Sequence, residues 1–236
     1  IKSKKHKILF TGKFSRGIGK NNTVFNLLKI LDKNKLLNKK KFLIKINKHI
    51  PNKAGLGGGS MNAANILKYF VEKKIIKVNN EQIREITSYI GSDVNLGLDT
   101  KNSILTSKNK IKRFRNCRRL FTLIVKPNFG CSTKDIYSQV NKFDRAILKK
   151  PSKKMFELNF LKKMKNSLEE IAFEKYSSLK KIKSYLNNLE NPIFVRMTGS
   201  GSAFVVYFKS RQKCLNAKKM FNKKYKNYWC IASKTI

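Results

Sequence analysis

The chain has 236 residues and a formal net charge of +41. Hydrophobic residues make up 41% and aromatic residues 11%, which is enough for one large globular domain or two smaller ones and argues against a disordered chain. The four cysteines lie far apart without a Cys/His cluster, which argues against a zinc site or a redox pair. No apolar run reaches the ~20 residues of a membrane-spanning helix. We therefore expect a cytoplasmic protein without a membrane partner. Because the chain begins with Ile1, we also expect that upstream sequence precedes it.

The excess of positive charge, with Lys+Arg 54 against Asp+Glu 13, has two interpretations. A strongly basic chain can bind nucleic acid, because neutralising phosphates releases counterions. Here the excess is mostly lysine, whereas specific recognition favours the planar fork of arginine. The lysines also occur in nearly every segment beside abundant Asn and Ile, which favours a compositional bias. A dedicated nucleic-acid surface would lie at residues 33–41 or 108–119, where we expect solvated loops.

Hydrophobic periodicity predicts the elements in chain order. In the N-terminal half we expect strands at residues 8–10 and 42–47, and helices beginning near 22, near 60 and at 80, the last ending at Gly91. In the C-terminal half we expect strands at 120–125, 193–197, 203–208 and 229–232, two helices within 153–189, and a helix at 214–221. A boundary after residue 119 would divide the chain into domains 1–119 and 120–236. The mixture of segregated helices and strands indicates an α+β fold.

A glycine-rich loop at residues 55–59 stands between a predicted strand and a predicted helix. Without side chains, the backbone N–H groups of such a loop can converge on an anion, and the helix dipole adds positive potential there. The loop lacks the Gly-Lys-Ser/Thr of a Walker A motif and the Gly-x-Gly-x-x-Gly of a dinucleotide fingerprint. Tight-turn geometry alone is the alternative. The flanking strand and helix favour a phosphate cradle.

Asp93 is a candidate general base, because acidic residues are scarce and this one follows a predicted helix in a glycine-flanked loop. Phosphoryl transfer needs little more from a base than correct placement beside a hydroxyl. A turn-forming or helix-capping role is the alternative. His6 and His49 are interpreted only as exposed polar residues.

Three motifs in order resemble those of the GHMP kinases, the small-molecule kinases that act on galactose, homoserine, mevalonate and phosphomevalonate. Residues 51–60 read Pro-Asn-Lys-Ala-Gly-Leu-Gly-Gly-Gly-Ser, residues 91–94 read Gly-Ser-Asp-Val, and residues 196–202 read Arg-Met-Thr-Gly-Ser-Gly-Ser. The resemblance implies a two-domain α+β kinase with an ATP-binding N-terminal domain that is incomplete at its start. The triple glycine, the segment 166–169 and the segment 127–137 are most similar to family members that phosphorylate the 2-hydroxyl of 4-diphosphocytidyl-2-C-methyl-D-erythritol, in isoprenoid precursor biosynthesis.

The resemblance also implies roles for individual residues. ATP, accompanied by Mg²⁺, would be bound by Pro51, Ala54, Gly55, Leu56, Gly57, Gly58, Gly59 and Ser60, with the Ser60 hydroxyl as a metal ligand. Asp93 would be the catalytic base. The small-molecule substrate would contact Tyr137, Thr198, Gly199, Ser200 and Gly201. The alternatives are a core position for Tyr137 and a plain hairpin turn at 198–202.

The chain departs from the family pattern at several places. The family's Pro-Ala-Lys strand, whose lysine lies beside the catalytic aspartate, and its Gly-Tyr-His segment are both absent from the sequence. Asn95 stands in place of the usual proline, and Met61 interrupts the usual Ser-Ser pair. Two other functions stay open: a GHMP kinase of the mevalonate or homoserine type, and a basic RNA-associated protein.

Overall fold

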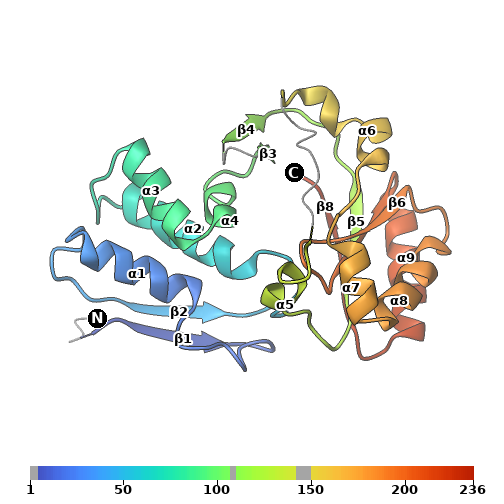
Figure 1. Cartoon of the computed structure of the whole chain (residues 1–236), viewed down its shortest axis with the longest axis horizontal. Helices are drawn as coiled ribbons and strands as arrows, with labels where there is room; N and C mark the ends of the chain where they lie inside the picture. The colour runs from blue at the N-terminus through green and yellow to red at the C-terminus, as the bar shows by residue number, and fades with distance from the viewer. Residues whose placement is uncertain (1–4, 107–109, 142–149) are drawn as a thin grey trace. The chain divides into compact units, whose positions relative to one another are not determined.

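The structure is a computed structural model that describes residues 5–106, 110–141 and 150–236. The chain packs as two compact units (Figure 1). The first comprises Ile1–Asn52 and Gly57–Thr100, and the second comprises Lys53–Leu56 and Lys101–Ile236. This division by packing falls earlier than the boundary after residue 119 that the sequence predicts. It also divides the glycine-rich loop, because Lys53–Leu56 packs with the second unit.

The first unit is built on a parallel strand pair with helices. Strand β1 (Lys7–Thr11) pairs in parallel with β2 (Leu43–Asn47), and helix α1 (Thr23–Lys33) forms the crossover between them. Helices α2 (Gly58–Glu72), α3 (Asn80–Ile90) and α4 (Ser92–Leu96) follow. The predicted apolar faces form the core, which includes Leu27, Leu31, Leu67 and Ile86, and Val94 of α4 joins them.

Local signals explain where these helices begin. The side chain of Asn22 accepts a hydrogen bond from Phe25 N and caps α1. Asn79 and Gln82 form a reciprocal capping box at the start of α3, and Gly91 ends that helix with a φ of 153°. Helix α2 begins differently, because Gly57 in the left-handed region is its N-cap and no side-chain cap bond is present.

The second unit contains two antiparallel sheets. Strands β3 (Asn102–Leu105) and β4 (Ile111–Phe114) form a pair. The larger sheet has the order β6-β7-β5-β8. Its strands are β5 (Phe121–Lys126), β6 (Phe194–Met197), β7 (Phe204–Phe208) and β8 (Trp229–Lys234). Alternate residues of β5, such as Leu123 and Val125, face the core, as expected for a sheet with one covered face.

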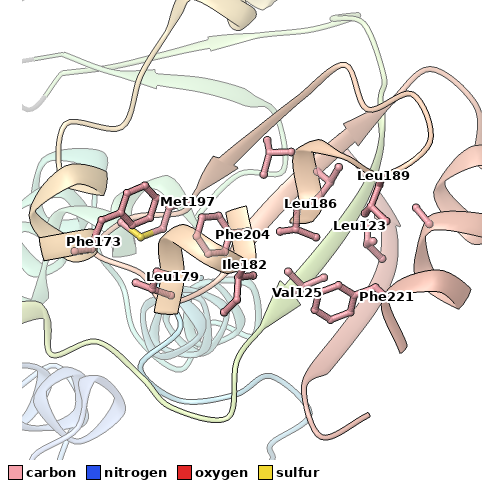
Figure 2. Close-up of a cluster of buried hydrophobic side chains, with 14 of the residues drawn as sticks. Leu123, Val125, Phe173, Leu179, Ile182, Leu186, Leu189, Met197, Phe204 and Phe221 are labelled. Carbon is pink, nitrogen blue, oxygen red and sulfur yellow. The ribbon is translucent and has the colours of Figure 1, made fainter. Parts of the chain in front are cut away.

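Helices supply the rest of this core. They are α5 (Thr133–Tyr137), a 3₁₀ turn η1 (Lys153–Phe156), α6 (Leu158–Lys163), α7 (Glu169–Lys175), α8 (Ser178–Asn187) and α9 (Arg211–Lys224). Figure 2 shows the apolar side chains of α7, α8 and α9 gathered against the sheet. Leu179, Ile182, Leu186 and Phe221 are at most 2% exposed. The burial of these side chains fixes the helices on the sheet.

The predicted α+β fold class is confirmed, and several local predictions need correction. The two helices expected within residues 153–189 are a 3₁₀ turn and three shorter α-helices. The run 108–119, expected to be a loop, contains β4, while residues 108 and 109 lie outside the described part of the chain. In the three described ranges, no helix is long and apolar enough to cross a membrane.

Candidate active site

The start of α2 carries three consecutive glycines, with Gly57 as the N-cap and Gly58 and Gly59 as the first two helical residues. Gly57 has a φ of 64°, a conformation that glycine adopts without strain. The first N–H groups of any helix lack intrahelical partners, and α2 has no side-chain cap to satisfy them. Because α2 is 15 residues long, its dipole adds positive potential at this end. The start of α2 can therefore receive an anion.

Each of the three glycines lies beside a different polar group. A Cβ atom built on Gly57 would lie 4.0 Å from Asp93 Oδ2, and one on Gly58 would lie 3.5 Å from Lys48 Nζ. A Cβ atom on Gly59 would lie 2.8 Å from Thr23 Oγ1. A carboxylate, an ammonium group and a hydroxyl therefore surround the first turn of α2.

Asp93 is held in this position by the short helix α4. Val94, the next residue, is fully buried in the core of the first unit and anchors the helix. Asp93 itself is exposed, and no hydrogen bond or ion pair with another described residue engages its carboxylate. An exposed carboxylate without a partner is available to accept a proton from a bound hydroxyl.

Lys48 is a residue of this site that the sequence analysis missed. It follows β2 directly, and its amide donates to Thr11 O while its carbonyl accepts from Phe14 N. The side chain is buried, with only 7% of the residue exposed. Burial disfavours the charged form and lowers the pKa of Lys48. The strand period of two offered a signal, because Lys48 continues the row of Phe42, Ile44 and Ile46.

The front of the glycine-rich loop is docked on the third motif. Thr198 Oγ1 donates to Gly55 O at 2.9 Å, and Ala203 N donates to Ala54 O at 3.2 Å. Gly55 has a φ of 69°, and a Cβ atom on it would lie 2.1 Å from Thr198 O. Only glycine fits at position 55, both for its conformation and for the space available. The turn at 198–202 therefore fixes the path of the loop.

Side chains from the second unit hold this turn in place. Asn166 Nδ2 donates to Met197 O at 2.9 Å and to Gly199 O at 2.8 Å. Glu169 Oε1 accepts from Met197 N at 3.0 Å. The remaining oxygen of Glu169 forms a 2.6 Å ion pair with Lys183 Nζ. The segment 166–169, noted in the sequence only for its resemblance, thus anchors the third motif.

The hydroxyl groups of the turn are also engaged. Ser200, which is 6% exposed, bonds through its hydroxyl to Thr133 Oγ1 at 2.9 Å. Ser202 Oγ donates to Phe129 O at 2.7 Å. The hydroxyls of Ser200 and Ser202 therefore tie the turn to neighbouring segments of the second unit, while the hydroxyl of Thr198 bonds to the glycine-rich loop. Gly199 is exposed and Gly201 is buried.

The other predicted site residues lie at different depths. Pro51 and Ala54 are buried, Leu56 and Ser60 are partly exposed, and Tyr137 is 55% exposed. Tyr137 is therefore not a core residue, and its ring can receive a ligand. Over the described ranges, no group of three or more His, Cys, Asp or Glu side chains could hold a metal ion.

Comparison with known proteins identifies the class to which this fold and site belong. The family model for the GHMP kinases N terminal domain matches residues 22–101, which include the start of α2 and Asp93. A solved structure of 4-(cytidine 5'-diphospho)-2C-methyl-D-erythritol kinase superposes with a TM-score of 0.74 at 21% identity. It covers 97% of this chain and 82% of that chain. This likeness shows the fold.

Two curated relatives narrow the assignment. The 4-diphosphocytidyl-2-C-methyl-D-erythritol kinase of Pelagibacter ubique (strain HTCC1062) is 53% identical over 234 residues, which are 99% of this chain and 83% of the relative. The kinase of the same name from Clostridium botulinum (strain Langeland) is 31% identical over 78% of this chain and 68% of the relative. The chain therefore belongs to the GHMP kinase family, and these relatives place it beside that family's 4-diphosphocytidyl-2-C-methyl-D-erythritol kinases.

Proposed function

We propose that the protein phosphorylates the 2-hydroxyl of 4-diphosphocytidyl-2-C-methyl-D-erythritol in isoprenoid precursor biosynthesis. As a GHMP kinase it uses ATP as its phosphoryl donor. The names of the 53% and 31% identical relatives support the choice of acceptor. The observation that carries the proposal is the position of Asp93 Oδ2, 4.0 Å from a Cβ atom built on Gly57, at the end of α2 suited to phosphates.

In this proposal the N–H groups at the start of α2 bind the phosphate oxygens of ATP. The 2-hydroxyl oxygen attacks the γ-phosphorus, and its proton passes to the carboxylate of Asp93. The bond between the γ-phosphorus and the bridging oxygen breaks, so ADP leaves with that bond's electrons. Most of the rate enhancement in such a reaction comes from positioning and electrostatics, which a rigid helix start provides.

Mg²⁺ belongs to this proposal as a companion of ATP. The site offers the Ser60 hydroxyl at the start of α2, and Mg²⁺ in kinases is bound largely by substrate phosphates with few protein ligands. An oxygen donor of this kind fits the ion. Bound there, Mg²⁺ would offset the negative charge that develops in phosphoryl transfer.

The roles proposed for the remaining site residues follow from their surroundings. Tyr137 is proposed to stack on the cytosine ring, and its 55% exposure supports this role. We also propose that Thr198, Gly199, Ser200 and Gly201 serve the substrate site by fixing the glycine-rich loop. The hydrogen bond from Thr198 Oγ1 to Gly55 O supports this role.

Replacement of Asp93 tests the proposed chemistry. We expect Asp93→Asn to lower turnover of the cytidylated substrate by about 100-fold or more, the scale of a lost general base. ATP affinity should change little, because the amides of α2 are retained. Steady-state kinetics and calorimetric ATP binding measure the two effects separately.

A matched control is Glu81→Gln, which removes another acidic side chain from the first turn of a helix and should leave turnover unchanged. Mevalonate and homoserine serve as competing acceptors in the same assay. Unchanged turnover in Asp93→Asn would refute the role of the base. Faster phosphorylation of either competing acceptor would refute the proposed substrate.

A further inference from the structure

Lys48 is a buried residue whose ammonium group has no partner among the described residues. The residue is 7% exposed, and within the described parts of the chain its Nζ makes no hydrogen bond or ion pair. Asp93 Oδ2 lies beside Gly57, whereas Lys48 Nζ lies beside Gly58. Even partial removal of a cation from water is unfavourable without a counter-charge, and burial lowers the pKa of Lys48. A fold that holds such a group is best explained by a negative charge that arrives with a ligand.

The surroundings of Lys48 show where this negative charge would lie. Its Nζ is 3.5 Å from the position of a Cβ atom on Gly58, the first helical residue of α2. Ile50 Cγ2 lies 3.7 Å from the same Cβ position on Gly58, so this side of the site is apolar. The ammonium group therefore points at the helix end whose free N–H groups attract anions. Two independent features, a helix N-terminus and a buried lysine whose ammonium group has no partner among the described residues, converge on one place.

We propose that Lys48 is a nucleotide-binding residue whose ammonium group pairs with a phosphate oxygen of the bound nucleotide at the start of α2. This inference rests on the proposed function and adds a phosphate-binding side chain to the same site. The pairing supplies the counter-charge that Lys48 lacks. It also adds a point charge to a cradle otherwise made of backbone dipoles, so the polyphosphate is bound more tightly than N–H groups alone allow.

Nucleotide binding by the Lys48→Met variant tests the inference. Methionine keeps the length and the apolar stem of lysine but removes the charge. We expect its affinities for ATP and ADP to fall about 10- to 100-fold, the range for a hydrogen bond to a charged group. Lys45→Met is the matched control, because Lys45 lies on β2 and is exposed. It should bind both nucleotides within about twofold of wild type.

Adenosine separates a phosphate contact from a base contact. Because adenosine has no phosphate, Lys48→Met should bind it as wild type does, and Lys48→Arg, which keeps the charge, should recover most of the ATP affinity. Calorimetry measures all affinities, and thermal unfolding verifies that each variant is folded. Lys48→Gln replaces the methionine variant if that variant does not fold.

Equal ATP affinity of Lys48→Met and wild type would overturn the inference. An equal loss of ATP and adenosine affinity would also overturn it. A third outcome separates the two proposals. If Lys48→Met loses ATP affinity but keeps adenosine affinity, while the wild-type protein does not phosphorylate the cytidylated substrate, the role of Lys48 is supported and the proposed acceptor is overturned.

Discussion

Gly55 shows how one residue can be fixed by two requirements at once. It needs a left-handed backbone, and the carbonyl of Thr198 occupies the space where a side chain would begin. Gly17 has a similar φ of 74°, but no atom lies within 4 Å of its Cβ position. These two glycines therefore separate the effect of backbone conformation from the effect of crowding.

We expect Gly17→Ala to destabilise the protein by about 1 kcal/mol, the cost of placing alanine in the left-handed region. Gly55→Ala should destabilise it by at least ~1 kcal/mol more, because the loop must also move away from Thr198. Urea unfolding of both variants measures the difference. Equal losses of stability would show that the contact between the loop and the turn at 198–202 is not tight.

At the scale of elements, Asp32 joins α1 to the strand pair. Its Oδ2 accepts hydrogen bonds from Lys41 Nζ at 2.6 Å and from His6 Nε2 at 2.9 Å. Phe42 N donates to His6 Nδ1, so Nε2 carries the proton that Asp32 accepts. We interpreted His6 from the sequence as an exposed residue, and this was wrong, because its side chain is only 13% exposed.

This network makes part of the stability depend on pH. Burial alone would raise the pKa of Asp32, but the hydrogen bonds from Lys41 and His6 and the charge of Lys41 outweigh it and lower that pKa. A carboxylate with a lowered folded-state pKa stabilises the fold above its unfolded-state pKa, near 4, and the contribution disappears as pH falls through the folded-state value.

We therefore expect Asp32→Asn to lower the urea midpoint at pH 7. The difference from wild type should shrink as the pH falls below about 4. Glu72→Gln is the control, because Glu72 forms only an exposed i,i+4 pair with Lys68 at 3.7 Å and should have little effect at any pH. A difference between Asp32→Asn and wild type that stays constant down to pH 2 would contradict the proposed linkage.

At the scale of the whole molecule, the net charge of +41 repels itself. Self-repulsion opposes the compact state and is screened by salt. We expect the thermal midpoint to rise by about 3 °C or more when NaCl increases from about 0.05 M to about 0.5 M. KCl should act like NaCl, because ionic strength is the cause. A midpoint that stays constant or falls would show that the charges are already balanced by their local arrangement.

The sequence by itself determined most of the elements, the family and the position of the proposed phosphate cradle. Apolar residues recur on one face of α1 and along β2, so local periodicity suffices to predict these elements. The glycines at 55–59 form a local cluster, and Asp93 is one of few acidic residues, so both features are visible in the sequence alone. The breaks among η1, α6, α7 and α8 could not be predicted, because packing on the sheet sets the ends of short helices.

Only the tertiary structure decided which groups meet at the start of α2. Thr23, Lys48 and Asp93 come from three separate segments of the chain. No local sequence pattern predicts that each of them lies beside a different glycine at the start of α2. The same holds for Thr198, which is far from Gly55 in sequence yet bonded to it. Such pairings depend on long-range packing of whole elements, because a side chain's neighbours across the fold are set by burial rather than by its own sequence context.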